Sequence, residues 1–184
     1  QRGRTFVIVL DDMHLTPQRE RDAKAAVASF LNNGVREGDY VTLVATSGDA
    51  WWTARMESGR DKLIGLLDRI VARRIFDISL EHMSDWEAMR IHVYNDDQVA
   101  RRVVQRYKDL GLQTFVEADR ENPFTGTTID PYVTARATET YFESRSRSQI
   151  TMLTLERVLN GLGRVPGRKS VILLSEGFVY DPNL

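Results

Sequence analysis

Two short acidic segments of this 184-residue sequence could carry chemistry, and each directly follows a run of apolar residues. The first is residues 11–15, DDMHL, and the second is residues 175–177, SEG. In an open α/β sheet, ligands collect at the carboxyl ends of the parallel strands, where these segments would lie. The carboxylates of Asp11, Asp12 and Glu176 could supply hard oxygen ligands to Mg²⁺ or Ca²⁺.

A structural interpretation of the same residues competes with the metal site. A carboxylate after a strand often caps the following helix, where the helix dipole favours its charge, and this interpretation is preferred for Asp11 and Asp12. His14 could add a nitrogen ligand for a transition metal, or act as a titrating switch or general base. No recognisable Ser or Cys nucleophile motif accompanies it. We therefore interpret His14 as a loop histidine.

Four segments have the composition of β-strands and would position these residues. They are Thr5–Leu10, Asp39–Thr46, Trp51–Met56 and Ser170–Gly177. The first and last are nearly continuous apolar runs, which is typical of strands buried on both faces of a parallel sheet. The third follows the second so closely that only antiparallel pairing fits.

Helical patterns connect these strands. Thr16-Pro17 predicts a helix start, Gly34 its end, and further helices are capped by Ser84 and Asn95. A last helix is expected from about Ala135 or Ser144 to Leu162. Residues 112–134 carry turn signals and predict a long irregular connection.

These patterns predict a single three-layer, Rossmann-like α/β domain over residues 1–184. Its central sheet is mainly parallel, with one antiparallel edge strand and a helical insertion at about 73–134. Because a hydrophobic strand at an open edge is a liability, we expect further strands of the fold beyond Leu184.

Other residues that could form a recognition surface have simpler interpretations. Trp51, Trp52 and Trp86 could form an aromatic patch, but in a hairpin strand and an amphipathic helix they are more often core or semi-buried anchors. Arg101 and Arg102 belong to a basic helix face with acidic neighbours, which is typical of a solvated face.

Composition excludes several classes of function. The net charge is -1, so no charge excess favours nucleic acid or an anionic membrane surface. No apolar run approaches the roughly 20 residues of a membrane span, which argues against membrane insertion. Cysteine is absent, which rules out disulfides and a Cys nucleophile.

Three stretches resemble bacterial proteins related to the von Willebrand factor type A domain. They are VIVLDDMHLTP, MSDWEAMRI and SRSQITMLTLERVLNGLGRVPGRKSVILLSEGF. The resemblance implies the von Willebrand A fold and an extracytoplasmic location, whether secreted, periplasmic or at the cell surface.

Ordinary members of that superfamily bind a divalent cation through Asp-x-Ser-x-Ser after the first strand, a Thr on a later loop and an Asp after the fourth strand. Here the first Asp matches Asp11, but Met13 and Leu15 replace both serines, and neither can ligate a hard cation. The final acidic position is Glu176. The Thr position falls somewhere among Ser146, Ser148 and Gln149. The resemblance thus implies a degenerate metal-ion-dependent adhesion site, without a cofactor or with weak Mg²⁺ or Ca²⁺.

The function expected from this sequence is a non-catalytic protein-binding or scaffolding module of the adhesion type. Candidate contact residues for a protein partner of unknown identity are His14, Ser148, Arg101 and Arg102. The alternative is a phosphoryl-transfer enzyme, phosphatase-like or receiver-like, that uses Asp11 and Asp12. Met at position 13 disrupts the Asp-x-Asp of such phosphatases, and no Gly-rich phosphate loop follows any strand.

Overall fold

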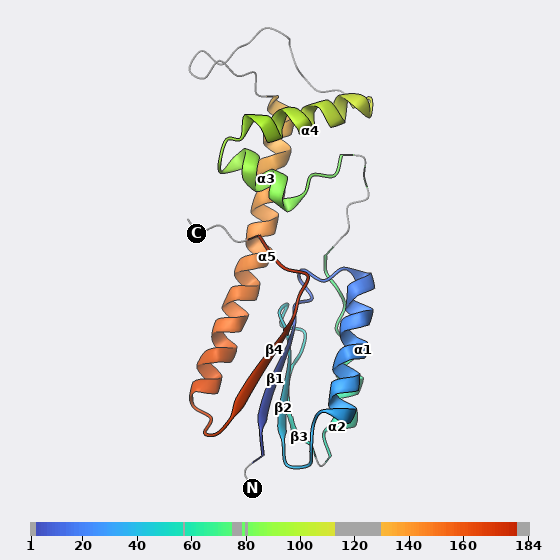
Figure 1. Ribbon diagram of the computed structural model, residues 1–184, viewed down its shortest axis with the longest axis vertical. Helices are drawn as coiled ribbons and strands as arrows, with labels where there is room; N and C mark the ends of the chain where they lie inside the picture. The colour runs from blue at the N-terminus through green and yellow to red at the C-terminus, as the bar shows by residue number, and fades with distance from the viewer. Residues whose placement is uncertain (1–2, 57, 75–78, 80, 113–129, 180–184) are drawn as a thin grey trace. The chain divides into compact units, whose positions relative to one another are not determined.

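The computed structural model describes residues 3–56, 58–74, 79, 81–112 and 130–179, and in these residues four strands form one sheet (Figure 1). The strands are β1 (Thr5–Leu10), β2 (Tyr40–Ala45), β3 (Trp51–Arg55) and β4 (Lys169–Leu174), in the order β3-β2-β1-β4. β1 is parallel to both β2 and β4, and β3 is antiparallel to β2. The predicted α/β class, with a mainly parallel sheet and one antiparallel edge strand, is confirmed.

The chain divides into two compact units. Unit 1 contains residues 1–76 and 147–178, and unit 2 contains residues 77–146 and 179–184. The predicted insertion at about 73–134 therefore lies mostly in unit 2, which continues to residue 146.

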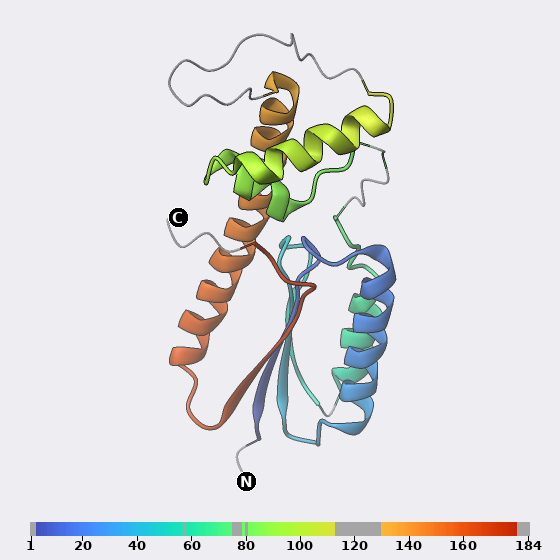
Figure 2. The same ribbon diagram turned by 45° about the horizontal axis from the view of Figure 1, so that its top comes forward.

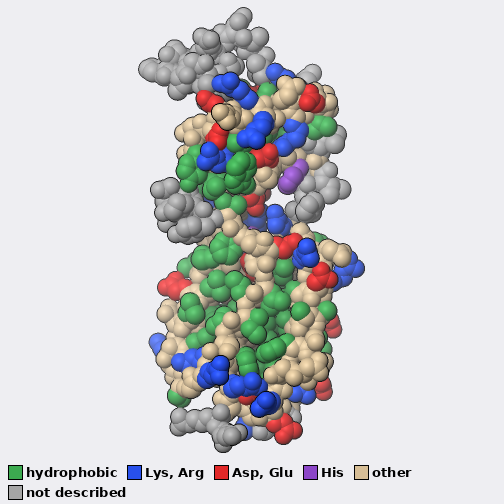
Figure 3. All heavy atoms as spheres, viewed as in Figure 1, with side chains coloured by type: hydrophobic (Ala, Val, Ile, Leu, Met, Phe, Trp, Pro, Cys, Tyr) green, Lys and Arg blue, Asp and Glu red, His purple; other side chains and the backbone are tan. Residues whose placement is uncertain are grey.

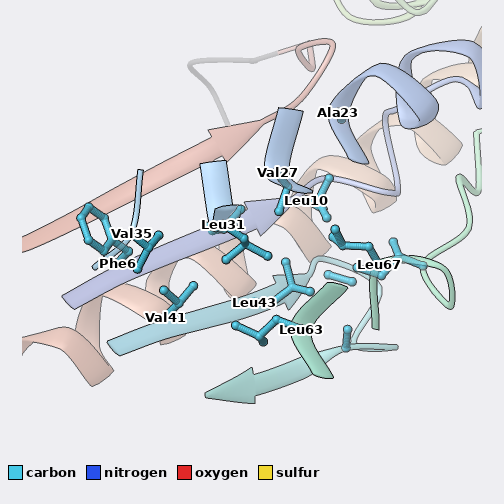
Figure 4. Packing of buried hydrophobic residues seen from close by; sticks show 14 of the residues in the cluster. Phe6, Leu10, Ala23, Val27, Leu31, Val35, Val41, Leu43, Leu63 and Leu67 are labelled. Carbon is cyan, nitrogen blue, oxygen red and sulfur yellow. The ribbon is translucent and has the colours of Figure 1, made fainter. Parts of the chain in front are cut away.

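One face of the sheet in unit 1 is covered by α1 (Pro17–Asn33) and α2 (Arg60–Leu67), as Figures 1 and 2 show from two directions. Thr16 caps α1 as predicted, accepting a hydrogen bond from the backbone N–H of Arg19. Alternate residues of β1 and β2 meet apolar stripes of the two helices, and each fully buried Leu or Ile stabilises the fold by about 1.5–3 kcal/mol. The buried residues labelled in Figure 4 are Phe6, Leu10, Ala23, Val27, Leu31, Val35, Val41, Leu43, Leu63 and Leu67.

The opposite face is covered by the part of α5 (Pro131–Gly163) that belongs to unit 1. Val158 is buried there against Val7, Val9 and Val44. The two helical layers and the sheet between them position the carboxyl ends of β1, β2 and β4 at one edge of unit 1.

β4 differs from the prediction of a strand buried on both faces. Val171 and Leu173 are 39% and 41% exposed, while Ile172 and Leu174 are only partly buried. The reason is position: β4 is the last strand in the sheet order, so only one of its edges is paired within the described residues.

Unit 2 is helical in its described part, with α3 (Asp85–His92), α4 (Asp97–Asp109) and the first half of α5. The capping box predicted at Ser84 is present, with Glu87 as its partner. The cap predicted at Asn95 is wrong by one residue, because Asp96 accepts from the first N–H groups of α4. The apolar faces share a core: Met83, Ala88, Ile91, Val99, Val103, Tyr107, Val133, Ala137 and Tyr141.

α5 begins earlier than expected. Pro131 is its first residue, and the Asp130 side chain accepts hydrogen bonds from the N–H groups of Tyr132 and Val133 at 2.9 and 3.3 Å. Proline suits the first helical position because its missing N–H would be unpaired there anyway. The predicted irregular connection over 112–134 is therefore wrong for 131–134, and residues 113–129 lie outside the described residues.

Candidate functional site

The acidic segment after β1 turns inward at the carboxyl ends of the strands. The Asp11 N–H donates to the Leu174 carbonyl at 2.9 Å, which continues the β1–β4 pairing by one residue. The His14 N–H then donates to the Asp11 carbonyl at 3.1 Å and closes a turn. Asp11 and Asp12 are 0% exposed and His14 is 2% exposed. These polar side chains are therefore part of the interior.

Four side chains donate hydrogen bonds to the Asp11 carboxylate. Thr46 and Thr151 donate to Oδ1 at 2.9 Å each, and Ser175 donates to Oδ2 at 2.6 Å. The Nδ1 atom of His14 lies 3.0 and 2.9 Å from Oδ1 and Oδ2. We call these five residues the Asp11 cluster. It joins β1, the residue after β2, α5 and the residue after β4 through one buried carboxylate.

The charged form of Asp11 is stabilised by these donors. Burial alone would raise the pKa of Asp11, but hydrogen bonds from His14, Ser175 and Thr151 and the nearby charge of His14 outweigh it, so the pKa lies below its ordinary value. A buried carboxylate with several charge-assisted hydrogen bonds fixes the elements that supply the donors.

The Asp12 carboxylate accepts fewer hydrogen bonds than the Asp11 carboxylate. Its Oδ1 atom accepts from the Thr46 hydroxyl and from the Ser47 N–H, both at 2.9 Å. The single Thr46 proton is thus shared between Asp11 and Asp12. The Oδ2 atom of Asp12 is buried with no hydrogen-bond partner among the described residues, and the Arg73 Nε atom lies 3.9 Å away. The Arg73 guanidinium is therefore within ion-pair distance of Asp12, although its hydrogen bond goes to Asp49, at 2.5 Å.

His14 takes up the position on Asp11 that an external cation would need. To donate to the carboxylate, Nδ1 must carry a proton, and this N–H then lies within hydrogen-bond distance of both oxygens. The Nε2 atom is buried without a hydrogen-bond partner in the described part of the chain, and the ring lies 5.7 Å from that of Phe178. Although predicted as a partner-contact residue, His14 faces the interior.

The predicted metal ligands do not converge. Glu176 accepts a hydrogen bond from the Thr16 N–H at 2.5 Å and lies 3.7 Å from Arg19, so it caps α1 and does not join Asp11 and Asp12. The described residues contain no group of three or more His, Cys, Asp or Glu side chains suited to a metal. With the Asp11 oxygens occupied by internal donors, the residues do not fit a high-affinity Mg²⁺ site, which requires near-octahedral oxygen ligation.

A catalytic role for the two aspartates would require substrate access. A nucleophilic carboxylate must contact the atom that it attacks, yet neither Asp11 nor Asp12 has exposed surface. The geometry gives no support to the phosphoryl-transfer alternative.

The remaining predicted contact residues are separate from this cluster. Ser148 is 7% exposed on α5, and Arg101 and Arg102 are exposed on α4 in unit 2. Thr46 and Thr151 were not predicted to belong to the site, and Ser175 lies in the predicted acidic segment 175–177 but was given no role of its own. A signal for one of them was present: the apolar face of α5 is interrupted by the buried hydroxyl residues Ser148, Thr151 and Thr154 at helical spacing.

The tryptophans contradict the expectation of core or semi-buried anchors. Trp51, Trp52 and Trp86 are 50%, 48% and 51% exposed. Trp51 and Trp52 are on β3, an edge strand whose one neighbouring strand among the described residues is β2, and they point to opposite faces of the sheet.

Each of the two β3 tryptophans lines a groove in unit 1. Trp52 lines a groove of about 360 Å³ beside Lys62, Leu66 and Arg69 of α2. Trp51 lines a groove of about 400 Å³ between the β2–β3 face and the end of α5. We call this second one the Trp51 groove. Its lining residues are Thr5, Val7, Tyr40, Thr42, Trp51, Thr53, Val158, Gly161, Leu162 and Val165.

Comparisons with protein-family models, with characterised proteins and with solved structures give no match to this chain. Among the described helices, none combines the length and apolarity needed to cross a membrane.

Proposed function

We propose that this chain is a non-catalytic protein-binding module, with the Trp51 groove as its contact surface. The observation that carries the proposal is the exposure of Trp51, at 50%, beside an apolar groove. Tryptophan is enriched among the residues that contribute most to protein–protein binding, because it buries a large rigid surface at little entropic cost. An exposed apolar patch of this kind is typical of an interaction site.

The side chains that line the groove indicate what kind of protein segment would fit it. It is lined by valine, leucine and aromatic side chains, together with the threonines Thr5, Thr42 and Thr53. A protein segment that presents apolar side chains with a few hydrogen-bonding groups would be complementary. No titratable pair lines the groove, so the surface suits binding better than acid–base catalysis.

The Asp11 cluster supports the non-catalytic part of the proposal. Its carboxylate is fully buried and accepts four internal hydrogen bonds, as expected of a structural centre. The von Willebrand A class, the degenerate adhesion site and an extracytoplasmic location rest on the sequence resemblance alone.

The test is a pull-down in which the wild-type chain and Trp51→Thr are each immobilised as bait. Each bait is incubated with an extract of the cells that naturally make the protein. We expect at least one protein to be retained by the wild type and lost from the variant, since removal of a Trp hot spot costs about 2 kcal/mol or more, which weakens binding about thirtyfold. Trp86→Thr is the matched control, because Trp86 is equally exposed but belongs to unit 2.

A third bait, with Arg101→Glu and Arg102→Glu, tests the exposed face of α4. Loss of binding in this bait alone would move the interface to α4. Identical sets of retained proteins for the wild type and Trp51→Thr would refute the Trp51 groove as the contact surface.

A further inference from the structure

We propose that the groove beside Trp52 binds an acidic segment of a partner protein, in which an apolar side chain lies between two carboxylates. We call it the Trp52 groove, and its lining residues are Trp52, Lys62, Gly65, Leu66 and Arg69. It is separate from the Trp51 groove, because Trp51 and Trp52 point to opposite faces of the sheet. Variants that abolish one contact should therefore leave the other intact.

α2 approaches β3 closely at one end of this groove. A Cβ atom at Gly59 would lie 2.3 Å from the Cβ atom of Ala54, so glycine allows the start of α2 to contact the strand. Trp52 is two residues from Ala54 and therefore on the same face of β3. Its side chain is 48% exposed and forms one wall of the groove, while α2 forms the other.

Gly65 keeps the groove open. It is inside α2, although glycine is a poor helix former. No close packing requires it, because a Cβ atom there would meet no atom of the described residues within 4 Å beyond the neighbouring helix backbone. The core contacts of α2 come from Leu63 and Leu67 instead. A larger side chain at residue 65 would thus occupy the groove and leave the core unchanged.

Two cations line the same groove. Lys62 and Arg69 are exposed and seven residues apart, which is two helical turns, or about 10 Å along the axis. The Arg69 N–H donates to the Leu66 carbonyl at 3.1 Å, so the helical turn continues after Leu67. Neither cationic side chain has a hydrogen bond or ion pair within the part of the chain that the structure describes.

Charge and shape together indicate the occupant. The acidic neighbours of the two cations, Asp61 and Asp68, do not line the groove. One carboxylate of a partner can therefore pair with Lys62 and another with Arg69, whose guanidinium matches a carboxylate in geometry. Between them, the apolar surface beside Trp52 is complementary to one apolar side chain. A protein segment with this acidic, apolar, acidic pattern satisfies all three requirements.

Single-stranded nucleic acid is the competing class of ligand, since bases stack on tryptophan and phosphates bind cations. Such a ligand requires a basic groove that follows the backbone over several nucleotides. The Trp52 groove has two cations, and the chain has a net charge of -1. The acidic protein segment is the better match.

A broader apolar surface is present elsewhere in unit 1. Figure 3 shows hydrophobic side chains gathered between α5 and α1, around β4. Strands beyond Leu184, which the sequence leads us to expect, would pack beside β4 and cover this surface. The Trp52 groove is at β3, the opposite end of the sheet order, so strands added beside β4 would leave it accessible.

The first experiment selects binders to the immobilised wild-type chain from a displayed library of random peptides. We expect enrichment of peptides that carry acidic residues on both sides of an apolar residue. Gly65→Leu, which fills the groove, is the comparison bait and should lose this class of peptide. Its melting temperature should stay equal or rise, because leucine is the better helix former.

Gly161→Leu is the matched control for this selection. A Cβ atom at Gly161 would also meet no described atom within 4 Å beyond the neighbouring helix backbone, but Gly161 lines the Trp51 groove. This variant should retain the acidic peptides. Enrichment of neutral or basic peptides, or equal recovery of the acidic class on Gly65→Leu, would overturn the proposal.

Calorimetric titration with one selected peptide measures the separate contributions. Trp52→Thr should weaken binding about thirtyfold, as expected of a Trp hot spot. Lys62→Glu and Arg69→Glu should each weaken it about fivefold at low salt, and by less at high salt. Asp68→Asn, which changes a charge outside the groove, is the control and should bind at least as tightly as the wild type. Unchanged binding by both charge reversals, or tighter binding of an oligothymidylate than of the peptide, would overturn the proposal.

Discussion

Thr151 and Asp11 are 140 residues apart in the sequence, yet the Thr151 hydroxyl donates to Oδ1 of Asp11 at 2.9 Å inside the protein. This bond connects α5 to the end of β1. Thr151→Val keeps the shape of the side chain but leaves the Asp11 carboxylate with one donor fewer. We expect it to lower the free energy of unfolding by about 1–3 kcal/mol, measured by urea denaturation.

Thr151→Ser is the matched control and should recover most of the lost stability, because it restores the hydroxyl. Thr154→Val should cost less, since Thr154 donates only to the Thr46 carbonyl, at 3.3 Å. A Thr151→Val variant as stable as the wild type would show that the Asp11 cluster does not hold α5 in place.

Divalent cations should not stabilise the wild-type protein. The internal donors of the Asp11 cluster already occupy both carboxylate oxygens, and Glu176 is bound to the start of α1. Addition of 5–10 mM Mg²⁺ or Mn²⁺, about the concentration needed to reveal a weak site, should leave the melting temperature unchanged. A rise that disappears in Asp11→Ala would contradict this prediction and restore the metal site.

Asp39 should make unit 1 sensitive to acid. Burial would raise the pKa of Asp39, but hydrogen bonds from the Arg4 side chain and from the N–H groups of Arg36 and Arg4 lower it to about 2. A carboxylate with a lowered pKa stabilises the folded protein above its unfolded pKa of 3.8 and loses that contribution as the pH falls towards 2. The contribution is about 1–2 kcal/mol, after allowance for the partial exposure of Arg4.

The measurement is urea unfolding of the wild type and Asp39→Asn between pH 6 and about pH 2.5. The variant should be less stable at pH 6, and the difference should shrink steadily below pH 4. Asp22→Asn, on the exposed surface of α1, is the control and should follow the wild type. A constant difference between wild type and Asp39→Asn across the range would exclude this linkage.

The capping box of α3 provides a prediction for unit 2. The Ser84 hydroxyl accepts from the Glu87 N–H at 3.2 Å, and the Glu87 carboxylate accepts from the Ser84 N–H at 3.0 Å. Ser84→Ala should destabilise the unit by about 1 kcal/mol. Faster hydrogen exchange of the amides in α3 would report the loss, and Ser84→Thr, which keeps the cap, should exchange at nearly the wild-type rate.

Sequence periodicity predicted the strands well, because their signals are local. Thr5–Leu10 and the strand at Trp51 begin at the predicted residues, and the strand predicted from Asp39 begins one residue later, at Tyr40. Exposure was predicted less well. The runs TFVIVL and KSVILL have similar composition, but only β1 has neighbours on both edges, and strand order is a property of the whole sheet.

Only the aspartates of the candidate site could be predicted from the sequence, again because only their signal is local. Asp11 and Asp12 follow a strand, so the topology alone brings them to the carboxyl edge of the sheet. Their partners are hydroxyl residues, which are common throughout the sequence and have no distinctive spacing. Only the fold selects Thr46, Thr151 and Ser175 from the others, and it also assigns Glu176 to α1.

The discontinuity of unit 1 has a consequence for synthesis. β1 pairs with β4 in a register that matches Thr5 with Lys169 and Leu10 with Leu174. β1 therefore cannot gain β4 as its second neighbouring strand until residue 174 has left the ribosome. Residues 77–146, which contribute most of unit 2, emerge well before that. The helical unit can therefore acquire local structure during translation, while β1, which can pair early with β2, still lacks the neighbour on its other edge. Pairing between strands so distant in the sequence is slow, and it leaves a hydrophobic strand exposed in the nascent chain. We therefore expect β1 to be the segment that most needs a ribosome-associated chaperone.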